Sequence, residues 1–249
     1  MTTATVDLKI QRRDSAGAPP RWEEFRVSFV PGMNVISALM EVRRNPVTRD
    51  GRATTPPVWD CSCLEEVCGA CTMVINGVPR QACSALVDGL KQPIELKPLS
   101  KFPLVRDLMV DRAKMFAALK RVRAWIPIDG TYDLGPGPRL SSADQEHGYL
   151  YARCMTCGCC MEACPQYHEG SDFIGPAPLA QVELFNTHPT GAMNAGERLD
   201  QILGPGGIND CGKAENCVRV CPKEIPLTDA LSHLFGTATG HWLRNLLRK

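Results

Sequence analysis

The N-terminal part of the chain alternates apolar and polar residues in short runs, which is the pattern of β-strands with one buried face. Residues 6–10 and 24–30 alternate in this way. The segment 15–20 between them is rich in Gly, Ala and Pro, so we expect a hairpin there. Two more short runs, at 72–76 and 94–97, predict further strands.

One helix is expected among these strands. Apolar residues recur at helical spacing between Val35 and Val42, Asn34 is in place to cap the first turn, and Pro46 ends the segment. The residues Gly77–Pro79 predict a turn after the third strand. Strands on both sides of one helix, around a Cys-rich loop, indicate a small α+β sheet domain.

The period changes after residue 105. Apolar residues between Leu108 and Ile126 recur every three or four positions and predict an amphipathic helix that begins near Arg106. Further helical patterns occur at 180–185 and 225–234, and alternating runs become rare. We therefore predict two domains, 1–105 with a sheet and 106–249 mostly helical.

Charge and hydropathy narrow the class of protein. The 28 Lys and Arg residues nearly balance the 27 Asp and Glu residues, and the net charge of +1 gives no reason to expect a nucleic-acid partner. The chain has no run of 18 or more apolar residues, and its start resembles neither a secretory signal nor a transit peptide. If the protein works at a membrane, we expect another subunit to hold it there.

Cysteine is frequent and unevenly placed. The chain has 13 Cys, an odd number that cannot all pair as disulfides, and they fall in three groups, at 61–83, 154–164 and 211–221. Tight groups with short gaps indicate metal ligation. Because thiolates persist best in reducing surroundings, we expect a cytosol-like compartment.

The first group has the spacing of a plant-type [2Fe–2S] site. Its four predicted ligands are Cys63, Cys68, Cys71 and Cys83. Gly69 and Ala70 are small enough for the backbone to approach the cluster and donate N–H bonds to its sulfur atoms. A zinc site or a redox-active thiol pair is the alternative, but zinc ribbons prefer two Cys-x2-Cys pairs and this group has one. Cys61 is interpreted as a neighbouring non-ligand, although it could replace Cys63 in register.

The second group has the run of a bacterial ferredoxin, in which the fourth Cys, the one before Pro, ligates the neighbouring cluster. This run consists of Cys154, Cys157, Cys160 and Cys164, followed by Pro165. The third group repeats the run as Cys211, Cys217 and Cys221, followed by Pro222. When the two runs are superposed, Ala214 stands where Cys157 stands in the first.

Exchange of the last Cys of each run gives two sites. A [4Fe–4S] cluster would be held by Cys154, Cys157, Cys160 and Cys221. The three remaining thiolates, which suit a [3Fe–4S] cluster, are Cys164, Cys211 and Cys217. Cys159 is left over and could compete with Cys160, but the two-residue gap after Cys157 favours Cys160. Zinc or disulfide use is the alternative for both sites.

Three such groups in this order resemble the iron–sulfur subunit of succinate dehydrogenase and quinol:fumarate reductase. The resemblance extends to Pro103–Asp111 and to Phe173–Ala177, and it covers nearly the whole chain. It implies an α+β fold, with an N-terminal plant-type ferredoxin domain of the β-grasp kind and a mostly helical, bacterial-ferredoxin-like C-terminal domain. Ala214 agrees with the three-iron site of the family.

The resemblance implies a subunit of a succinate:quinone oxidoreductase of the respiratory chain and the tricarboxylic acid cycle. A flavoprotein subunit with FAD would oxidise succinate, so no catalytic residue is expected in this chain. Electrons would pass singly through [2Fe–2S], [4Fe–4S] and [3Fe–4S] to a quinone, where this subunit meets one or more membrane anchor subunits. Fumarate reduction would use the same path in reverse. The expected place is the cytoplasmic face of a bacterial inner membrane.

At the positions that line the quinone pocket in this family, the present chain has different residues. Members often have a Trp pair after the first Cys-Pro and a His after the first Cys of the last group, whereas this chain has His168, Glu169 and Gly212. These pocket residues therefore do not carry over, and His168 is either a proton donor to quinone or a surface residue. The basic, amphipathic segment 240–249 either meets lipid head groups or a partner helix, or packs as a terminal helix.

Other classes of protein stay open at this point. A free ferredoxin-type carrier is usually small and acidic, and this chain is neither. Electron-transfer subunits of other membrane oxidoreductases, such as heterodisulfide-reductase-like or glycolate-oxidase-like assemblies, commonly carry two complete four-Cys runs, and Ala214 interrupts one run here. A zinc-stabilised interaction module would be colourless, whereas clusters are brown.

Overall fold

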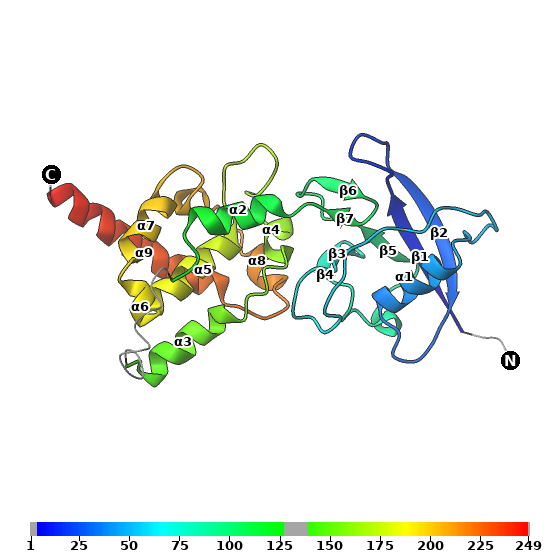
Figure 1. The fold of residues 1–249 in the computed structure, drawn as a ribbon, viewed down its shortest axis with the longest axis horizontal. Helices are drawn as coiled ribbons and strands as arrows, with labels where there is room; N and C mark the ends of the chain where they lie inside the picture. The colour runs from blue at the N-terminus through cyan, green and yellow to red at the C-terminus, as the bar shows by residue number, and fades with distance from the viewer. Residues whose placement is uncertain (1–3, 127–138, 249) are drawn as a thin grey trace. The chain divides into compact units, whose positions relative to one another are not determined.

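The computed structural model describes residues 4–126 and 139–248. These residues form two compact units (Figure 1). The first unit comprises the chain up to Arg112 together with Met155–Glu162, and the second comprises Ala113–Cys154 and the chain from Ala163 onward. The first unit therefore includes part of the second Cys group, which no pattern in the sequence indicates. The domain boundary after residue 105 stays a prediction.

The first unit is built on a five-stranded sheet. Its elements are β1 (Thr5–Arg12), β2 (Arg21–Ser28), α1 (Val35–Arg44), β3 (Thr72–Ile75), β4 (Val78–Gln81), a 3₁₀ helix (Val87–Gly89), β5 (Ile94–Lys97), β6 (Leu104–Arg106) and β7 (Met109–Val110). The strand order is β2-β1-β5-β3-β4, with β1 and β5 parallel and the other pairs antiparallel. The hairpin β1–β2 is confirmed, with Thr5 paired to Ser28 and Arg12 paired to Arg21.

The helix α1 covers this sheet and closes its core. Asn34 caps the helix as predicted, because its Oδ1 accepts a bond of 2.8 Å from the backbone N–H of Ser37. The apolar stripe of the helix is buried, including Val35 and Leu39, and packs into the same cluster as Leu8 and Ile10 of β1. Burial of these side chains is the main stabilising term for so small a domain.

The turn predicted at Gly77–Pro79 is wrong by one or two residues. The tight turn is Asn76–Gly77, which both have positive φ (50° and 82°), and β4 begins directly at Val78. Two such residues in succession are typical of a two-residue hairpin loop. Pro79 is tolerated inside β4 because this strand lies at the edge of the sheet. No further strand there needs a hydrogen bond from the N–H that proline lacks.

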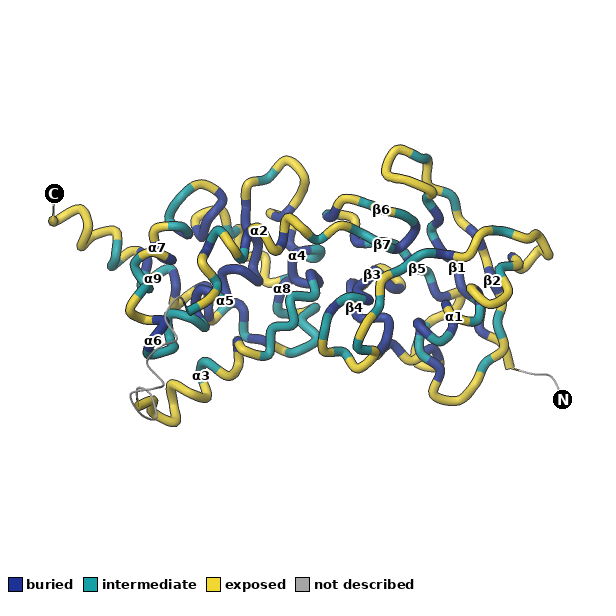
Figure 2. Tube along the Cα trace, in the orientation of Figure 1, coloured by how far each residue is buried: buried dark blue, intermediate teal, exposed yellow. Residues whose placement is uncertain are grey.

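The second unit is helical. Its elements are α2 (Ala113–Arg121), α3 (Ser142–Ala152), α5 (Pro176–Thr187), α6 (Pro189–Ala192), α7 (Ala195–Leu203), a 3₁₀ helix (Ile208–Asp210), α8 (Asn216–Arg219) and α9 (Leu227–Leu247), and α4 (Cys159–Ala163) ends where this unit resumes. Helix α5 lies at the centre and contacts α2, α3, α6, α7 and α9. Its buried run, from Pro176 to Glu183, forms the core of the unit (Figure 2).

The helix predicted from Arg106 to Ile126 is partly wrong. Only Ala113–Arg121 is helical, and the residues before it form the small hairpin β6–β7. Asp107 stands in this hairpin with φ +47°, a left-handed conformation that interrupts a helix. Its fully buried carboxylate accepts bonds from the Arg12 guanidinium and from the backbone N–H of Arg13 and Val58. A buried ion pair between residues far apart in sequence has overridden the local helical pattern.

Candidate iron–sulfur sites

The loop before β3 turns several backbone N–H groups toward Cys63. The amides of Glu65, Val67 and Cys68 lie 3.4, 3.3 and 3.4 Å from the Cys63 Sγ. Positive φ angles at Leu64 and Glu66 produce this curl of the chain. Successive N–H groups pointing inward form a concavity that favours negative charge.

These N–H groups lower the pKa of the Cys63 thiol. The amide of Glu65, then those of Val67 and Cys68, lower the pKa of the Cys63 thiol to about 7. A thiol that ionises readily is the form that binds iron. Cys61 lies differently, packed against the hydrophobic core of the sheet. This arrangement supports the choice of Cys63 over Cys61 as the first ligand of the group.

Cys71 and Cys83 come together at one end of the strands β3 and β4. Thr72 pairs with Gln81 in the antiparallel ladder, and the backbone N–H of Ala82 donates to the carbonyl of Cys71 at 3.2 Å. Burial raises the pKa of the Cys71 thiol to about 12, and the neighbouring Cys83 also acts on it. The ladder thus brings the fourth thiol of the predicted [2Fe–2S] set beside Cys71 from the residues that follow β4.

Gly69, between Cys68 and Cys71, has a contact that the sequence does not reveal. It adopts φ +69°, and a β-carbon there would lie 2.6 Å from the Cα and 2.8 Å from the Cβ of Cys157. Its carbonyl accepts bonds from the Arg112 guanidinium at 2.7 Å and from the Thr72 hydroxyl at 2.8 Å. The sequence predicts that Gly69 brings the backbone close to a cluster; in the structure it also brings this loop against the second Cys group.

Cys159 is fully buried beside Cys157 and Gln81. The Gln81 Nε2 donates to the Cys159 Sγ at 3.5 Å, and a hydrogen bond from Cys159 lowers the pKa of the Cys157 thiol to about 7. The same bond, together with burial, raises the pKa of Cys159. Cys159 is therefore placed as a hydrogen-bonding neighbour of a predicted ligand. The sequence offered Cys159 only as a competitor of Cys160 and indicated no role for Gln81.

The ligands predicted for [4Fe–4S] are divided between the two units. Cys157 and Cys160 belong to the first unit, and Cys154 and Cys221 to the second. Cys160 is buried at the start of α4, and the Cys221 Sγ accepts a bond of 3.4 Å from the backbone N–H of Ile225. This ligand set stays a prediction from the spacing.

The three thiols predicted for [3Fe–4S] lie together in the second unit. Cys164, Cys211 and Cys217 line one cavity of about 400 Å³, and Ala214 lines it with them. Burial raises the pKa of the Cys217 thiol to about 11, with the nearby Cys164 and Cys211 adding to the effect. Lys213 and Glu215, on either side of Ala214, both have positive φ. The cavity thus brings together the three thiols and the Ala214 methyl group, and the assignment of these thiols to a cluster stays a prediction.

The rest of this cavity was not predicted. Its wall is largely apolar and comes from the segment after Pro165 and from the first turns of α9, with Phe173, Leu231 and Phe235. Asn216, another lining residue, donates from Nδ2 to the carbonyl of Ala163 at 3.0 Å and so ties α8 to the neighbouring Cys164 segment. The helical pattern at 225–234 predicts the helix that forms this part of the wall, but it does not predict that the helix faces the three thiols.

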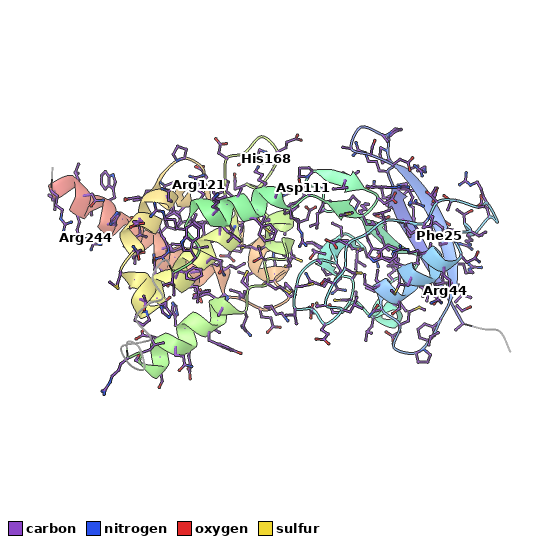
Figure 3. The ribbon with its side chains drawn as sticks, in the orientation of Figure 1. Phe25, Arg44, Asp111, Arg121, His168 and Arg244 are labelled. Atoms are coloured by element: carbon purple, nitrogen blue, oxygen red, sulfur yellow. The ribbon has the colours of Figure 1, made fainter. Side chains whose placement is uncertain are left out.

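The positions that depart from the family pattern lie on the surface or close to it. His168, which is labelled in Figure 3, is exposed. A β-carbon at Gly212 would lie 2.5 Å from the Nε2 of Gln166, so a larger residue would have to displace the Gln166 side chain. Gln166 thus occupies the space that a side chain at position 212 would need.

The other histidines serve the packing of the second unit. The carboxylate of Glu183, buried in α5, contacts the His147 Nε2 at 3.0 Å and the His233 Nδ1 at 2.7 Å, which joins α3, α5 and α9. The His188 Nδ1 accepts a bond from the backbone N–H of Gly191 and caps α6. These contacts give the three histidines a structural role in the second unit.

Within residues 4–126 and 139–248, no three His, Cys, Asp or Glu side chains converge on a point that could hold a single metal ion. A cluster keeps its ligand sulfur atoms farther apart than one ion does, so this finding concerns single-ion sites. In the same ranges, no helix is both long and apolar enough to cross a membrane.

Comparisons with known proteins match both halves of the chain. A family described as a 2Fe-2S iron-sulfur cluster binding domain matches residues 7–117, and a 4Fe-4S dicluster domain matches residues 151–225. The succinate dehydrogenase iron-sulfur subunit of Bacillus subtilis (strain 168) is 59% identical over 230 residues, which cover 92% of this chain and 91% of that protein. The fumarate reductase iron-sulfur subunit of Wolinella succinogenes is 30% identical over 223 residues, covering 88% and 90%.

A solved structure shares the fold. A chain of the Mycobacterium smegmatis Sdh1 complex in the apo form superposes with a TM-score of 0.79 at 22% identity, over 96% of this chain and 97% of that chain. The predicted fold class, a [2Fe–2S] sheet domain followed by a mostly helical dicluster domain, is confirmed.

Proposed function

This chain belongs to the family of iron–sulfur subunits of succinate dehydrogenase and fumarate reductase, and we propose that it conducts electrons from an FAD-containing subunit to a quinone. The identity of 59% to a succinate dehydrogenase subunit, against 30% to a fumarate reductase subunit, favours succinate oxidation as the physiological direction. The observation that carries the proposal of a three-cluster path is the cavity shared by Cys164, Cys211, Cys217 and Ala214.

The first domain would hold [2Fe–2S] through Cys63, Cys68, Cys71 and Cys83. Reduction adds a negative charge to such a site, and the inward N–H groups of Glu65, Val67 and Cys68 are placed to stabilise it. Cys71 and Cys83 give the site a buried side, which slows attack by solvent. The Gly69 carbonyl, held by Arg112 and Thr72, keeps the loop in this form.

The dicluster domain would hold [4Fe–4S] through Cys154, Cys157, Cys160 and Cys221, and [3Fe–4S] through Cys164, Cys211 and Cys217. When bound, the clusters supply one-electron carriers, which divide the electron pair of succinate oxidation into single steps. The protein provides the thiolates, the amide bonds and the dry surroundings that tune each potential. Ala214 supplies no thiolate, so the third site would retain three irons.

The partners follow from the same family membership. A flavoprotein subunit with FAD would deliver electrons at one end, and one or more membrane anchor subunits would bind this chain at the other, with quinone at their interface. The protein would then sit at the cytoplasmic face of a bacterial inner membrane. His168 is exposed, so its imidazole would be accessible to donate a proton to quinone.

Low-temperature EPR of the purified complex, with iron counted alongside, tests this function. The ligand sets require 2 + 4 + 3 irons, or about nine per chain. We expect an oxidised three-iron signal near the free-electron value and a [2Fe–2S] signal after dithionite reduction. About ten irons without the oxidised signal would mean two cubanes and another electron-transfer complex. Copurification with a larger subunit that carries flavin distinguishes this function from a free carrier.

A further inference from the structure

The end of α9 carries an exposed apolar face. Trp242, Leu243, Leu246 and Leu247 have exposed fractions of 52%, 46%, 55% and 85%. At about 100° of rotation per residue they share one arc of the helix, because the pairs 242/246 and 243/247 are one turn apart. In Figure 2 this end of the chain, near the label C, is drawn as exposed.

This face is not the one that holds α9 in its unit. The buried positions of the helix are Leu227, Ala230, Leu231, Leu234 and Ala238, which follow one another at spacings of one to four residues. His241 continues that series, with its Nε2 at 2.7 Å from the Asp200 Oδ1 of α7. The helix therefore uses one face for its own core and turns its last apolar residues in another direction.

Positive charge borders the exposed apolar face. Arg244 and Arg248 are one turn apart on the adjoining side of the helix, both exposed, and Arg244 lies on the outer part of α9 in Figure 3. Lys249 follows in the sequence, and no Asp or Glu occurs after Asp229. A surface that complements this end must itself be negative.

The chemistry of this end fits lipid better than a protein partner. A narrow apolar stripe with one Trp, bordered by Arg residues, is typical of helices that lie in the interface of a bilayer, where Trp prefers the head-group region. We propose that residues 242–248 lie on an anionic phospholipid surface, with Trp242, Leu243, Leu246 and Leu247 at the acyl boundary and Arg244 and Arg248 at the phosphates. The chain thereby contacts lipid directly, in addition to any contact through an anchor subunit.

Vesicle binding of the full, cluster-loaded chain tests this proposal. The wild-type protein is sedimented with phosphatidylglycerol vesicles and with phosphatidylcholine vesicles at low salt. The double variant Arg244→Gln/Arg248→Gln should bind anionic vesicles about 25-fold more weakly, at about fivefold per arginine. The double variant Leu243→Ser/Leu247→Ser should lose about tenfold or more. Met193→Ser and Lys120→Gln, exposed apolar and basic residues elsewhere in the same unit, serve as matched controls and should bind as the wild type.

The outcomes distinguish a lipid surface from a protein partner as what covers the apolar face of α9. Binding to anionic vesicles alone, lost in both double variants and kept in the controls, supports the lipid surface. Equal affinity of the wild type and the arginine variant would overturn it. So would absence of vesicle binding combined with failure of the leucine variant to assemble with its partner subunits, which would assign the face to a protein. Cluster EPR on the same samples shows that each variant is folded, and the assay does not depend on electron transfer.

Discussion

Gly69 lies so close to Cys157 that a β-carbon on Gly69 would stand 2.6 Å from the Cys157 Cα. The two residues belong to different Cys groups and lie far apart in the sequence. Their contact brings the backbone of the predicted [2Fe–2S] loop against the backbone of a predicted [4Fe–4S] ligand. In the proposed path, single electrons cross between these two clusters. The distance between the clusters would then depend on the absence of a side chain at Gly69.

Replacement of Gly69 by alanine should therefore disturb the approach of the two loops. We expect Gly69→Ala to lower the free energy of unfolding by about 2–4 kcal/mol, from overpacking and from the left-handed backbone together. It should also weaken the magnetic coupling between reduced [2Fe–2S] and [4Fe–4S], measured as slower spin relaxation in EPR.

Gly77→Ala is the matched control for this experiment. Gly77 has φ +82°, close to the φ of Gly69, but no atom lies within 4 Å of its β-carbon position. The control should cost only the strain of the backbone, about 1 kcal/mol, and leave the spin relaxation unchanged. Equal effects of the two substitutions would show that strain, not the contact with Cys157, explains the loss.

The contact between Gly69 and Cys157 is an example of what the sequence does not predict. Strands and their hairpin follow from alternation between near neighbours, and the cap of α1 follows from Asn34 alone. The predicted ligand sets follow from the spacing within each Cys group and from the exchange of the last Cys between the second and third groups. Contacts between distant segments, such as Gly69 with Cys157 or Arg12 with Asp107, produce no periodic pattern in the sequence from which they could be predicted. The same kind of contact explains why residues 106–112 are not helical despite an apolar pattern of helical period.

The Arg12–Asp107 pair should be a main support of the first unit. Both side chains are fully buried, and Asp107 accepts from Arg12 at 3.0 Å and from two backbone N–H groups. Arg12 also pairs with the buried Glu23 at 2.5 Å, so Asp107→Asn removes one of its two buried partner charges and should cost about 3 kcal/mol of unfolding free energy. Asp14→Asn, which removes the exposed partner of Arg21, should cost less than about 1 kcal/mol. Anaerobic urea unfolding compares them, and similar midpoints would contradict this account.

Cys159 and Cys61 should be dispensable for iron binding. Cys159→Ser keeps a small polar group beside Cys157 and Gln81, so we expect an unchanged iron content, whereas Cys160→Ser should lose the [4Fe–4S] cluster. Cys61→Ser should likewise leave the reduced [2Fe–2S] signal in place, and Cys63→Ser should alter or abolish it. Iron analysis and EPR of the four variants decide the matter. Loss of iron in Cys159→Ser with retention in Cys160→Ser would exchange the two assignments.

Tyr151 should make the second unit sensitive to alkali. Burial, and then the charges of Glu183 and Asp229, raise the pKa of the Tyr151 phenol to about 12, whereas the unfolded chain ionises near pH 10. The unfolded state then loses its proton first, so this stability is complete below pH 10 and declines as the pH rises toward 12. Tyr151→Phe should remove a dependence on the order of 2 kcal/mol across this range. Urea unfolding at pH 8 and pH 10.5 measures the first part of this decline, about 0.8 kcal/mol. An equal decline in both proteins would refute the assignment.

Ala214 is the residue on which the proposed three-iron site depends. It lines the cavity with Cys164, Cys211 and Cys217, and its neighbours Lys213 and Glu215, not Ala214 itself, carry the left-handed backbone angles. The backbone at position 214 therefore does not need glycine and can accept a cysteine. A thiol there would take the place that Cys157 has in the superposed run. We expect Ala214→Cys to bind a fourth iron, which raises the count from about nine to about ten per chain and removes the oxidised three-iron EPR signal.

The size-matched variant Ala214→Ser separates ligation from bulk. A serine hydroxyl fills nearly the same space but is a poor ligand for iron in such clusters, so the three-iron signal should persist with about nine irons. In Ala214→Cys the new cubane should also have a lower reduction potential than the cluster it replaces, which slows the last electron transfer to quinone. An oxidised three-iron signal of full intensity in Ala214→Cys would show that the third cluster is not bound in this cavity as assigned.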